Sequence, residues 1–441
     1  MKERLINLKY GKKNLPLNVP SKDLLRIITP RAVPVQENPL GYIDSVLDNP
    51  TSGPPFEEIF QRGDRVTVIL SDITRYTGSQ VYLPILIDRL NRVGIIDENI
   101  KIVFALGIHR QQSPQEQRMI VGDEVYKRIK VYDHDPFDSK NLTFLGKTDS
   151  GARIDINRMV AEADKIILAG TIDFHYLAGF GGGRKSILPG VASFDSCLDV
   201  HLMVLNPPEV GGKHPKVKTG VLDGNPFHEA MLQACNFLGT IFLFNTILST
   251  GKEIIEVVTG DYIAAHRYGC DLLLRNFSPE LDEKADLVIV SCGGFPKDIN
   301  FIQAHKSIDH AINILRDNGV MIVLAECSDG FGNPTFLDWF QYNDLSDFER
   351  ALRRNFEING QTAYSTLIKT KKVRIILISE LADEDAKKMS MIPADSLDQG
   401  LSIAYEMLDK NPSTYVIPDG GSVLPRVGDQ HSRYDRKEGN Q

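Results

Sequence analysis

The chain has 441 residues, of which 42% are hydrophobic and 24% are charged. This composition is typical of a globular protein, and the length predicts two or three domains with an ample core. A formal net charge of -8 and a pI near 5.7 argue against a general nucleic-acid binder, because a phosphate backbone requires a basic surface. Any phosphate site must therefore be local.

No segment predicts membrane insertion or export. The longest apolar runs, such as VTVIL, KIIL and VRIILI, are far shorter than the roughly 20 residues that cross a bilayer. The N-terminal residues lack the apolar core of a secretory signal. The five cysteines are scattered and form no CxxC pair, which disfavours a disulfide framework, and we therefore expect a cytoplasmic protein.

Short β-branched runs alternate with amphipathic segments in the first half of the chain. Strands are predicted at residues 66–70, 101–107, 130–134 and 165–170, with a helix at 81–93 and a pair of edge strands within 239–260. This alternation predicts a largely parallel sheet covered by helices.

A second series of the same kind begins near residue 285. It comprises strands at 286–291, 320–325, 373–379 and 414–418, and helices at 308–318 and 396–408. The polar stretch SPELDEK, at 278–284, predicts the boundary. The fold class is therefore α/β, with an N-terminal domain at 1–281 and a C-terminal domain at 282–441, whose polar tail after about residue 424 is expected to be disordered.

Polar residues follow four of the predicted strands. The segments are SDITR (71–75), IHR (108–110), TIDFH (171–175) and SCGGFPKD (291–298). Parallel α/β sheets bind ligands at the carboxyl ends of their strands, so we expect these loops to meet at one rim.

A glycine-rich segment lies in HYLAGFGGGRKSILPG. Gly181, Gly182 and Gly183 form a flexible backbone that can approach a phosphate, and Arg184 and Lys185 supply two cations. The spacing matches neither a Walker loop nor GxGxxG. The alternative is an ordinary surface turn with solvated charges.

Three histidines are candidates for chemistry. His109 and His175 each follow a strand, and imidazoles at one rim make a candidate acid/base pair, although a strand-capping role is commoner for a single histidine. His201 lies on a predicted helix at 194–205, four residues after Cys197, and with His175 the two could bind zinc. Against zinc, cysteine is often a small buried hydrophobe. The remaining histidines are expected in loops or on helix surfaces.

Four further polar residues could contact a ligand. Asp72 and Arg75 follow the first strand, and arginine favours bidentate contact with carboxylate or phosphate, although a loop salt bridge explains the pair equally. Gln303 and Lys306 lie three residues apart at the start of a helix. They could hold a substrate carboxylate or simply be solvated.

At these residues the chain resembles the nickel-dependent lactate racemase family of 2-hydroxyacid racemases and epimerases. The motif FHYLAGFGGGRKSILPG carries the likeness, and SDITR, GIHR, the later helical histidine and SCGGFPKDINFIQAHK follow in the expected order and spacing. The resemblance runs nearly end to end. It implies two α/β domains with the active site in the cleft between them.

The family's cofactor is a nickel-pincer nucleotide, a pyridinium-3-thioamide-5-thiocarboxylic acid mononucleotide that binds Ni. The resemblance implies that Lys185 can tether it, that His201 binds the nickel, and that His109 and His175 are the catalytic acid/base pair. It also implies cofactor contacts from Asp72, Thr74 and the Gly181–Gly183, Arg184 segment, and substrate contacts from Arg75, Gln303 and Lys306. Proteins that build the cofactor are implied as partners for loading.

Two positions depart from the family pattern. Ile302 stands where an aromatic residue is expected, and Gln361 lies near the expected position of a tryptophan. The resemblance places both changes in the substrate pocket, so the expected substrate is lactate or a larger 2-hydroxy acid. A zinc-dependent hydrolase or lyase and a non-enzymatic nucleotide-cofactor-binding protein are the alternatives.

Overall fold

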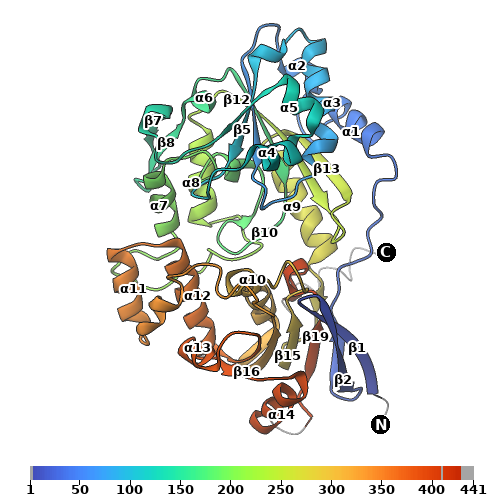
Figure 1. Cartoon of the computed structure of the whole chain (residues 1–441), viewed down its shortest axis with the longest axis vertical. Helices are drawn as coiled ribbons and strands as arrows, with labels where there is room; N and C mark the ends of the chain where they lie inside the picture. The colour runs from blue at the N-terminus through green and yellow to red at the C-terminus, as the bar shows by residue number, and fades with distance from the viewer. Residues whose placement is uncertain (1–2, 409–410, 429–441) are drawn as a thin grey trace, which may run out of the picture. The chain divides into compact units, whose positions relative to one another are not determined.

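The computed structural model describes residues 3–408 and 411–428 (Figure 1). Two compact units divide the chain. The central unit consists of Val33–Asn206 and His214–Leu273. The terminal unit contains the described residues of Met1–Ala32, Pro207–Lys213 and Leu274–Gln441.

The central unit is built on a six-stranded sheet with the order β13-β12-β9-β4-β5-β6. Its strands are β4 (Val66–Ser71), β5 (Ile100–Ala105), β6 (Lys130–Asp133), β9 (Lys165–Thr171), β12 (Thr240–Leu248) and β13 (Ile254–Asp261). Only the β12–β13 pair is antiparallel. The predicted strands and the edge pair within 239–260 are therefore confirmed.

Helices cover the central sheet because its strands are apolar on both faces. Residues 66–70 of β4 are all buried, and alternate ones pack in one cluster with apolar residues of α3. The helices are α1 (Pro39–Asp48), α2 (Phe56–Ile59), α3 (Ser79–Arg92), α4 (Pro114–Val121), α5 (Asp123–Arg128), α6 (Arg158–Ala161), α7 (Phe194–Leu202), α8 (Pro226–Cys235) and α9 (Ala264–Phe277). Two small hairpins add β7 (Leu142–Lys147) with β8 (Arg153–Asn157), and β10 (Phe174–His175) with β11 (Gly179–Phe180).

The terminal unit holds a second six-stranded sheet, which is parallel throughout and has the order β18-β17-β16-β15-β19-β3. Its strands are β3 (Leu24–Ile27), β15 (Ala285–Ser291), β16 (Leu315–Leu324), β17 (Arg374–Ile378), β18 (Ile392–Pro393) and β19 (Thr414–Ile417). A hairpin of β1 (Glu3–Tyr10) and β2 (Lys13–Pro20), and the short pair β14 (Glu280–Leu281) and β20 (Arg426–Val427), complete its strands.

The helices of the terminal unit are α10 (Phe301–Ala311), α11 (Leu345–Arg354), α12 (Ile358–Lys372), α13 (Asp383–Lys388) and α14 (Leu397–Met407). The prediction of a helix at 308–318 was wrong in its bounds. The helix begins at Phe301, where the Asn300 side chain accepts the Gln303 amide as an N-cap, and residues from Leu315 onward already belong to β16. The apolar spacing of the segment continues across the turn and does not mark where the helix ends.

The first residues of the chain belong to the terminal unit, although the domain prediction placed residues 1–281 together. The cause is the parallel pairing of β3 with β19, which makes the N-terminal segment an edge strand of the second sheet. In the tail, residues 426–427 pair with β14, while 429–441 lie outside the described residues, so their predicted disorder stays a prediction.

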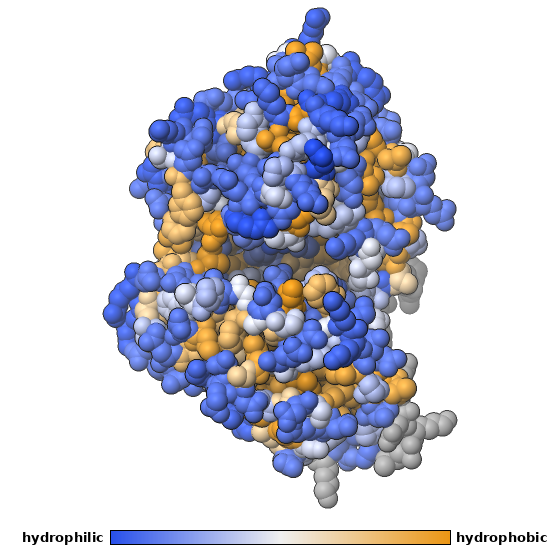
Figure 2. All heavy atoms as spheres, in the orientation of Figure 1, coloured by the Kyte–Doolittle hydropathy of each residue, from blue (hydrophilic) through white to orange (hydrophobic). Residues whose placement is uncertain are grey.

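On the face drawn in Figure 2, hydrophilic residues predominate and apolar residues form smaller groups. Within residues 3–408 and 411–428, no helix combines the length and the apolar character needed to cross a bilayer. All five cysteines are free thiols, and each is buried.

Candidate active site

The candidate site lies at the point where the strand order of the central sheet reverses. From β4 the chain proceeds outward to β5 and β6, whereas from β9 it proceeds to β12 on the other side. Ligands of open α/β sheets bind at such a switch point, beyond the carboxyl ends of the strands. Three of the four predicted rim segments follow β4, β5 and β9 there, and the fourth follows β15 of the other sheet.

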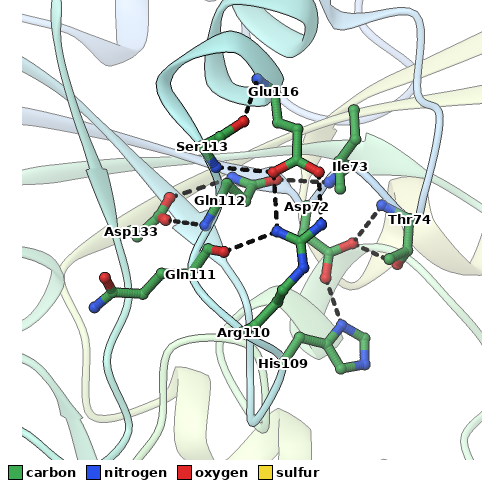
Figure 3. A network of polar contacts seen from close by, with 10 residues as sticks. All are labelled: Asp72, Ile73, Thr74, His109, Arg110, Gln111, Gln112, Ser113, Glu116 and Asp133. Atoms are coloured by element: carbon green, nitrogen blue, oxygen red, sulfur yellow. Dashed lines mark hydrogen bonds and ion pairs between the residues drawn. The ribbon is translucent and has the colours of Figure 1, made fainter.

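Asp72 and His109 form a hydrogen-bonded pair across two of these loops (Figure 3). The Nδ1–H of His109 donates to Asp72 Oδ2 over 2.5 Å. The other carboxylate oxygen accepts from the backbone N–H of Thr74 at 3.0 Å and from its hydroxyl at 2.5 Å. A proton on Nδ1 leaves the lone pair of the neutral His109 ring on Nε2, which is the form of a general base.

The Asp72 carboxylate is held in its charged form. Burial alone would raise the pKa of Asp72, but hydrogen bonds from His109 and Thr74 and the nearby charge of Arg75 outweigh it, so that the pKa lies below its usual value. The Asp72 side chain is 5% exposed, while the His109 side chain is 54% exposed. Hydrogen bonds rather than packing therefore orient the His109 ring.

His175, on β10, is held in the opposite tautomer. Its Nδ1 accepts the backbone N–H groups of Leu177 at 3.3 Å and Ala178 at 3.1 Å. A neutral ring that accepts at Nδ1 carries its proton on Nε2. His175 thus presents an N–H donor at Nε2, where His109 presents a lone pair.

Arg75 pairs with an acidic residue that the sequence did not single out. Its Nη1 lies 3.2 Å from Asp173 Oδ2, so the ion pair joins the loop after β4 to the loop after β9. Both side chains are partly exposed, at 34% and 44%. The place of Asp173 in TIDFH, directly after a buried strand, was the available signal.

The three glycines are required by the packing of their own loop. A side chain on Gly181 would lie 1.9 Å from Asp173 Oδ1, and one on Gly182 would lie 2.5 Å from Asn245 Oδ1. The Gly183 amide donates to the same Asn245 oxygen at 2.9 Å. The loop is thus fixed against β12, and its predicted approach to a phosphate stays a prediction.

Arg184 was predicted to face an anion, but its guanidinium is 0% exposed. Its Nε donates to His228 Nδ1 at 2.9 Å and its Nη1 to His266 Nε2 at 2.7 Å. The remaining hydrogen bonds go to backbone carbonyls of residues 178, 181 and 182. Arg184 therefore holds the glycine loop from inside, and His228 and His266, expected at the surface, are buried acceptors.

The buried cluster of Arg184, His228 and His266 carries one positive charge. Burial lowers the pKa of Arg184 to about 10, which still leaves it charged at neutral pH. Burial and the Arg184 charge together lower the pKa of His228 to about 3 and that of His266 well below its usual value. Both imidazoles are consequently neutral.

Lys185 differs from its neighbour Arg184. Lys185 is half-buried, and its side-chain nitrogen forms no hydrogen bond or ion pair with any residue that the structure describes. Burial, reinforced by the Arg75 charge, lowers the pKa of Lys185 to about 7. A large fraction of Lys185 is therefore an uncharged, nucleophilic amine at neutral pH.

His201 lies on α7, a helix that begins at the Ser193 N-cap. Its Nδ1–H donates to the carbonyl of Cys197 at 2.6 Å, which places the lone pair on Nε2. Burial lowers the pKa of His201 to about 4, and the Lys185 charge acts in the same direction. A neutral imidazole oriented through its second nitrogen is the usual form of a metal ligand.

The predicted zinc set of His175, Cys197 and His201 is not supported. The Cys197 thiol is buried and donates to the Pro189 carbonyl at 3.5 Å. Among the described residues, no three His, Cys, Asp or Glu side chains gather as a metal site.

Gln303 and Lys306 lie in the terminal unit, on the exposed face of the first turns of α10. The Lys306 ammonium donates to Gln303 Oε1 at 2.7 Å. Their predicted role toward a substrate, and the predicted location of the site in a cleft between domains, stay predictions.

Comparison with known proteins identifies the family. The lactate racemase N-terminal domain model matches residues 10–212, and the lactate racemase C-terminal domain model matches residues 281–425. Two proteins named lactate racemase are each 30% identical to the chain. The one from Thermoanaerobacterium thermosaccharolyticum aligns over 96% of this chain and 99% of its own length, and the one from Lactiplantibacillus plantarum over 95% and 99%.

Solved structures agree with this assignment. The lactate racemase apoprotein of Thermoanaerobacterium thermosaccharolyticum superposes with a TM-score of 0.87 over 96% of this chain and 100% of its own, at 30% identity. A Thermotoga maritima protein at 18% identity shares the fold, with a TM-score of 0.62 over 91% of this chain and all of its own. The two-domain α/β fold and the enzyme class, an isomerase, are thereby confirmed, and the chain belongs to the lactate racemase family.

Proposed function

We propose that the chain inverts C2 of a 2-hydroxy acid, either lactate or a larger acid, with His109 and His175 as the two acid/base groups. The observation that carries the proposal is the pair of oppositely protonated imidazoles that follow β5 and β9, close to the switch point of one sheet. The names of the relatives support lactate itself. The departures at Ile302 and Gln361 favour testing larger acids too.

The chain's residues fit a nickel-pincer nucleotide as cofactor. His201 offers one oriented, neutral nitrogen to a metal whose other ligands would come from the cofactor. Lys185 offers an amine that is largely uncharged just above pH 7 and would hold the cofactor as a thioamide, formed from a thioacid with loss of water. A single histidine suffices for such a metal, so the lack of a three-residue cluster among the described residues agrees with this cofactor.

The proposed chemistry begins at the hydroxyl group of the substrate. The Nε2 lone pair of His109 takes the hydroxyl proton, and the Asp72 carboxylate stabilises the imidazolium that results. When bound, the cofactor would supply an acceptor for the C2 hydrogen with its electron pair. Loss of this hydrogen would leave a planar 2-keto acid, and its return to the opposite face would invert C2.

His175 is the second acid/base group of the proposal. While its Nδ1 accepts the two amides, its Nε2–H can donate a hydrogen bond to a developing negative oxygen of the substrate and stabilise it. To act as the base for the other enantiomer, the ring must move its proton to Nδ1, and the amides of Leu177 and Ala178 must then turn away. The two histidines are therefore unequal at the start of the reaction.

Positively charged residues would orient the substrate. Arg75 lies on the same rim and can hold a carboxylate if its contact with Asp173 is exchanged. We include Lys306 and Gln303 as substrate contacts and Thr74 as a cofactor contact in the proposal. We also propose that the protein works in the cytoplasm and depends on cofactor-building proteins for loading.

The test uses protein produced together with the cofactor-building enzymes. Each enantiomer of lactate and of a series of larger 2-hydroxy acids is supplied, and chiral chromatography measures the product. We expect one acid of the series to racemise, and His109→Ala to lower kcat by about 10²–10⁴-fold because acid/base assistance is lost.

His214→Ala is the matched control, since this partly buried histidine lies in a loop, where its Nδ1 accepts the Lys216 amide at 3.3 Å. It should retain full activity. No turnover of any 2-hydroxy acid by nickel-loaded protein would refute the proposal.

A further inference from the structure

Gln112 and Asp133 connect the three loops that follow β4, β5 and β6 (Figure 3). The Gln112 side-chain oxygen accepts the backbone N–H of Ile73 at 2.7 Å. Its side-chain nitrogen donates to Asp133 Oδ1 at 3.2 Å, and its backbone N–H donates to Asp133 Oδ2 at 2.5 Å. Asp133 is the last residue of β6, so one amide side chain ties three strand ends together.

These bonds lie next to the candidate base. Ile73 directly follows Asp72, and Gln112 comes three residues after His109. We infer that Gln112 and Asp133 are positioning residues, which hold the two loops in register so that Asp72 meets His109 Nδ1. The inference rests on the proposed role of His109 as the base.

The burial of the groups supports a role in positioning. The Gln112 residue is 8% exposed, whereas the His109 side chain is 54% exposed and depends on hydrogen bonds for its orientation. A contact of 2.5 Å between side chains of two different loops requires that the loops themselves be fixed. Catalytic groups need such support, because small displacements remove much of their effect.

Other contacts of the same loop are less suited to this task. Arg110 forms a two-bond ion pair with Glu116, and Ser113 caps α4, but both contacts anchor the loop to α4 and neither reaches the loop that carries Asp72. Exposed ion pairs of this kind contribute little to the free energy of folding. Gln117 also donates to Asp133, at 3.0 Å, and helps to orient this carboxylate.

The experiment exchanges the two partners of the central hydrogen bond. Gln112→Glu places a carboxylate against Asp133 and repels it. Asp133→Asn removes a charge and places an N–H group opposite a donor. The double variant Gln112→Glu with Asp133→Asn restores the central hydrogen bond, because the introduced carboxylate accepts from Ile73 and from the introduced amide, while a turn of the Gln117 amide presents its oxygen to the same N–H group.

Two readouts separate positioning from mere stability. In the cofactor-free protein, ¹⁵N NMR of the His109 ring should change from a single Nδ1–H form to a mixture of tautomers in each single variant. In the loaded enzyme, kcat should fall by about 10-fold or more with little change in KM, because base catalysis is weakened. The double variant should recover the single Nδ1–H form of His109 and most of the lost kcat.

Gln111→Ala is the matched control. This neighbouring glutamine is exposed, and the side chain points away from the network in Figure 3. Its NMR spectrum and kcat should equal those of the unaltered protein. Thermal unfolding of every variant confirms that it is folded.

Folded single variants with an unchanged His109 tautomer would overturn the inference, and so would a double variant that recovers neither signal. If either single variant does not fold, Gln112→Ala, which removes the link without adding charge, is measured in its place with the same two outcomes. Failure of the unaltered protein to racemise any acid would instead refute the proposed function, since the NMR measurement needs no activity.

Discussion

Lys185 and Arg184 are adjacent in sequence but have different chemistry. The Arg184 guanidinium donates hydrogen bonds to buried groups of the protein. The Lys185 side chain forms no hydrogen bond with the described residues, so its amine remains reactive. An anion-binding pair was predicted from the residue types alone. The sequence could show which residue types meet at the loop, but it could not show that one of them turns into the core.

The amine of Lys185 should titrate near neutral pH. Because its pKa is lowered to about 7, labelling by an amine-reactive acylating reagent should reach half of its maximal rate near pH 7, as followed by mass spectrometry of the peptide that contains it. In the unfolded chain the same residue should titrate at roughly 10.4, which provides the control. A midpoint near 10 in the folded protein would contradict the environment described for Lys185.

The sign of the linked stability follows from the same shift. The folded-state pKa is lower than the unfolded one, so the unfolded chain binds more protons between these values. The contribution of Lys185 to the free energy of unfolding therefore increases as the pH rises from about 7 toward the unfolded value.

At the scale of elements, the glycine loop is secured to two helices through Arg184. The guanidinium joins the loop to His228 on α8 and His266 on α9. Arg184→Met would leave buried acceptors without donors, which costs about 3 kcal/mol or more. Equilibrium unfolding in urea should show this loss.

The control for that measurement is Arg65→Met, which removes an exposed ion pair with Asp164. It should leave the urea midpoint nearly unchanged. Equal urea midpoints for the two variants would show that the buried cluster of Arg184, His228 and His266 does not stabilise the protein.

The elements that the sequence predicted best are the buried central strands. The predicted strand at 165–170 corresponds to Lys165–Thr171, and the one at 414–418 to Thr414–Ile417. Their apolar runs are bounded by polar residues, so local pattern suffices. The hairpin Glu3–Tyr10 with Lys13–Pro20 was not predicted, although Leu15, Leu17 and Val19 alternate as in a half-buried strand. The helix Ile358–Lys372 was not predicted because several of its buried residues are polar.

The candidate site was predicted less evenly. Asp72, His109 and His175 follow strands of the central unit, Lys185 lies in the short helical turn after the glycines, and His201 lies in the last turn of α7; the family resemblance singled out all five. Asp173, Gln112 and Asp133 were not found, because their importance comes from contacts between loops that lie far apart in sequence.

At the scale of the whole molecule, the chain order and the spatial order differ. The first strand of the terminal sheet comes from residues 24–27, whose partner strand lies at 414–417. Local periodicity contains no information about such pairing. The alternation of strands and helices predicted a parallel sheet whose loops share one rim, whereas the strand order, and with it the reversal point of the central sheet, came only from the structure.

The most direct test of the central claim follows the hydrogen at C2. The loaded enzyme is given one enantiomer of a turned-over 2-hydroxy acid that carries deuterium at C2, in ordinary water, and mass spectrometry is applied to the opposite enantiomer. Transfer of the hydrogen with its electron pair predicts that the deuterium remains at C2 of the inverted product. Replacement of the label by solvent hydrogen would show that the C2 hydrogen leaves as a proton, and it would contradict the roles assigned to His109 and His175.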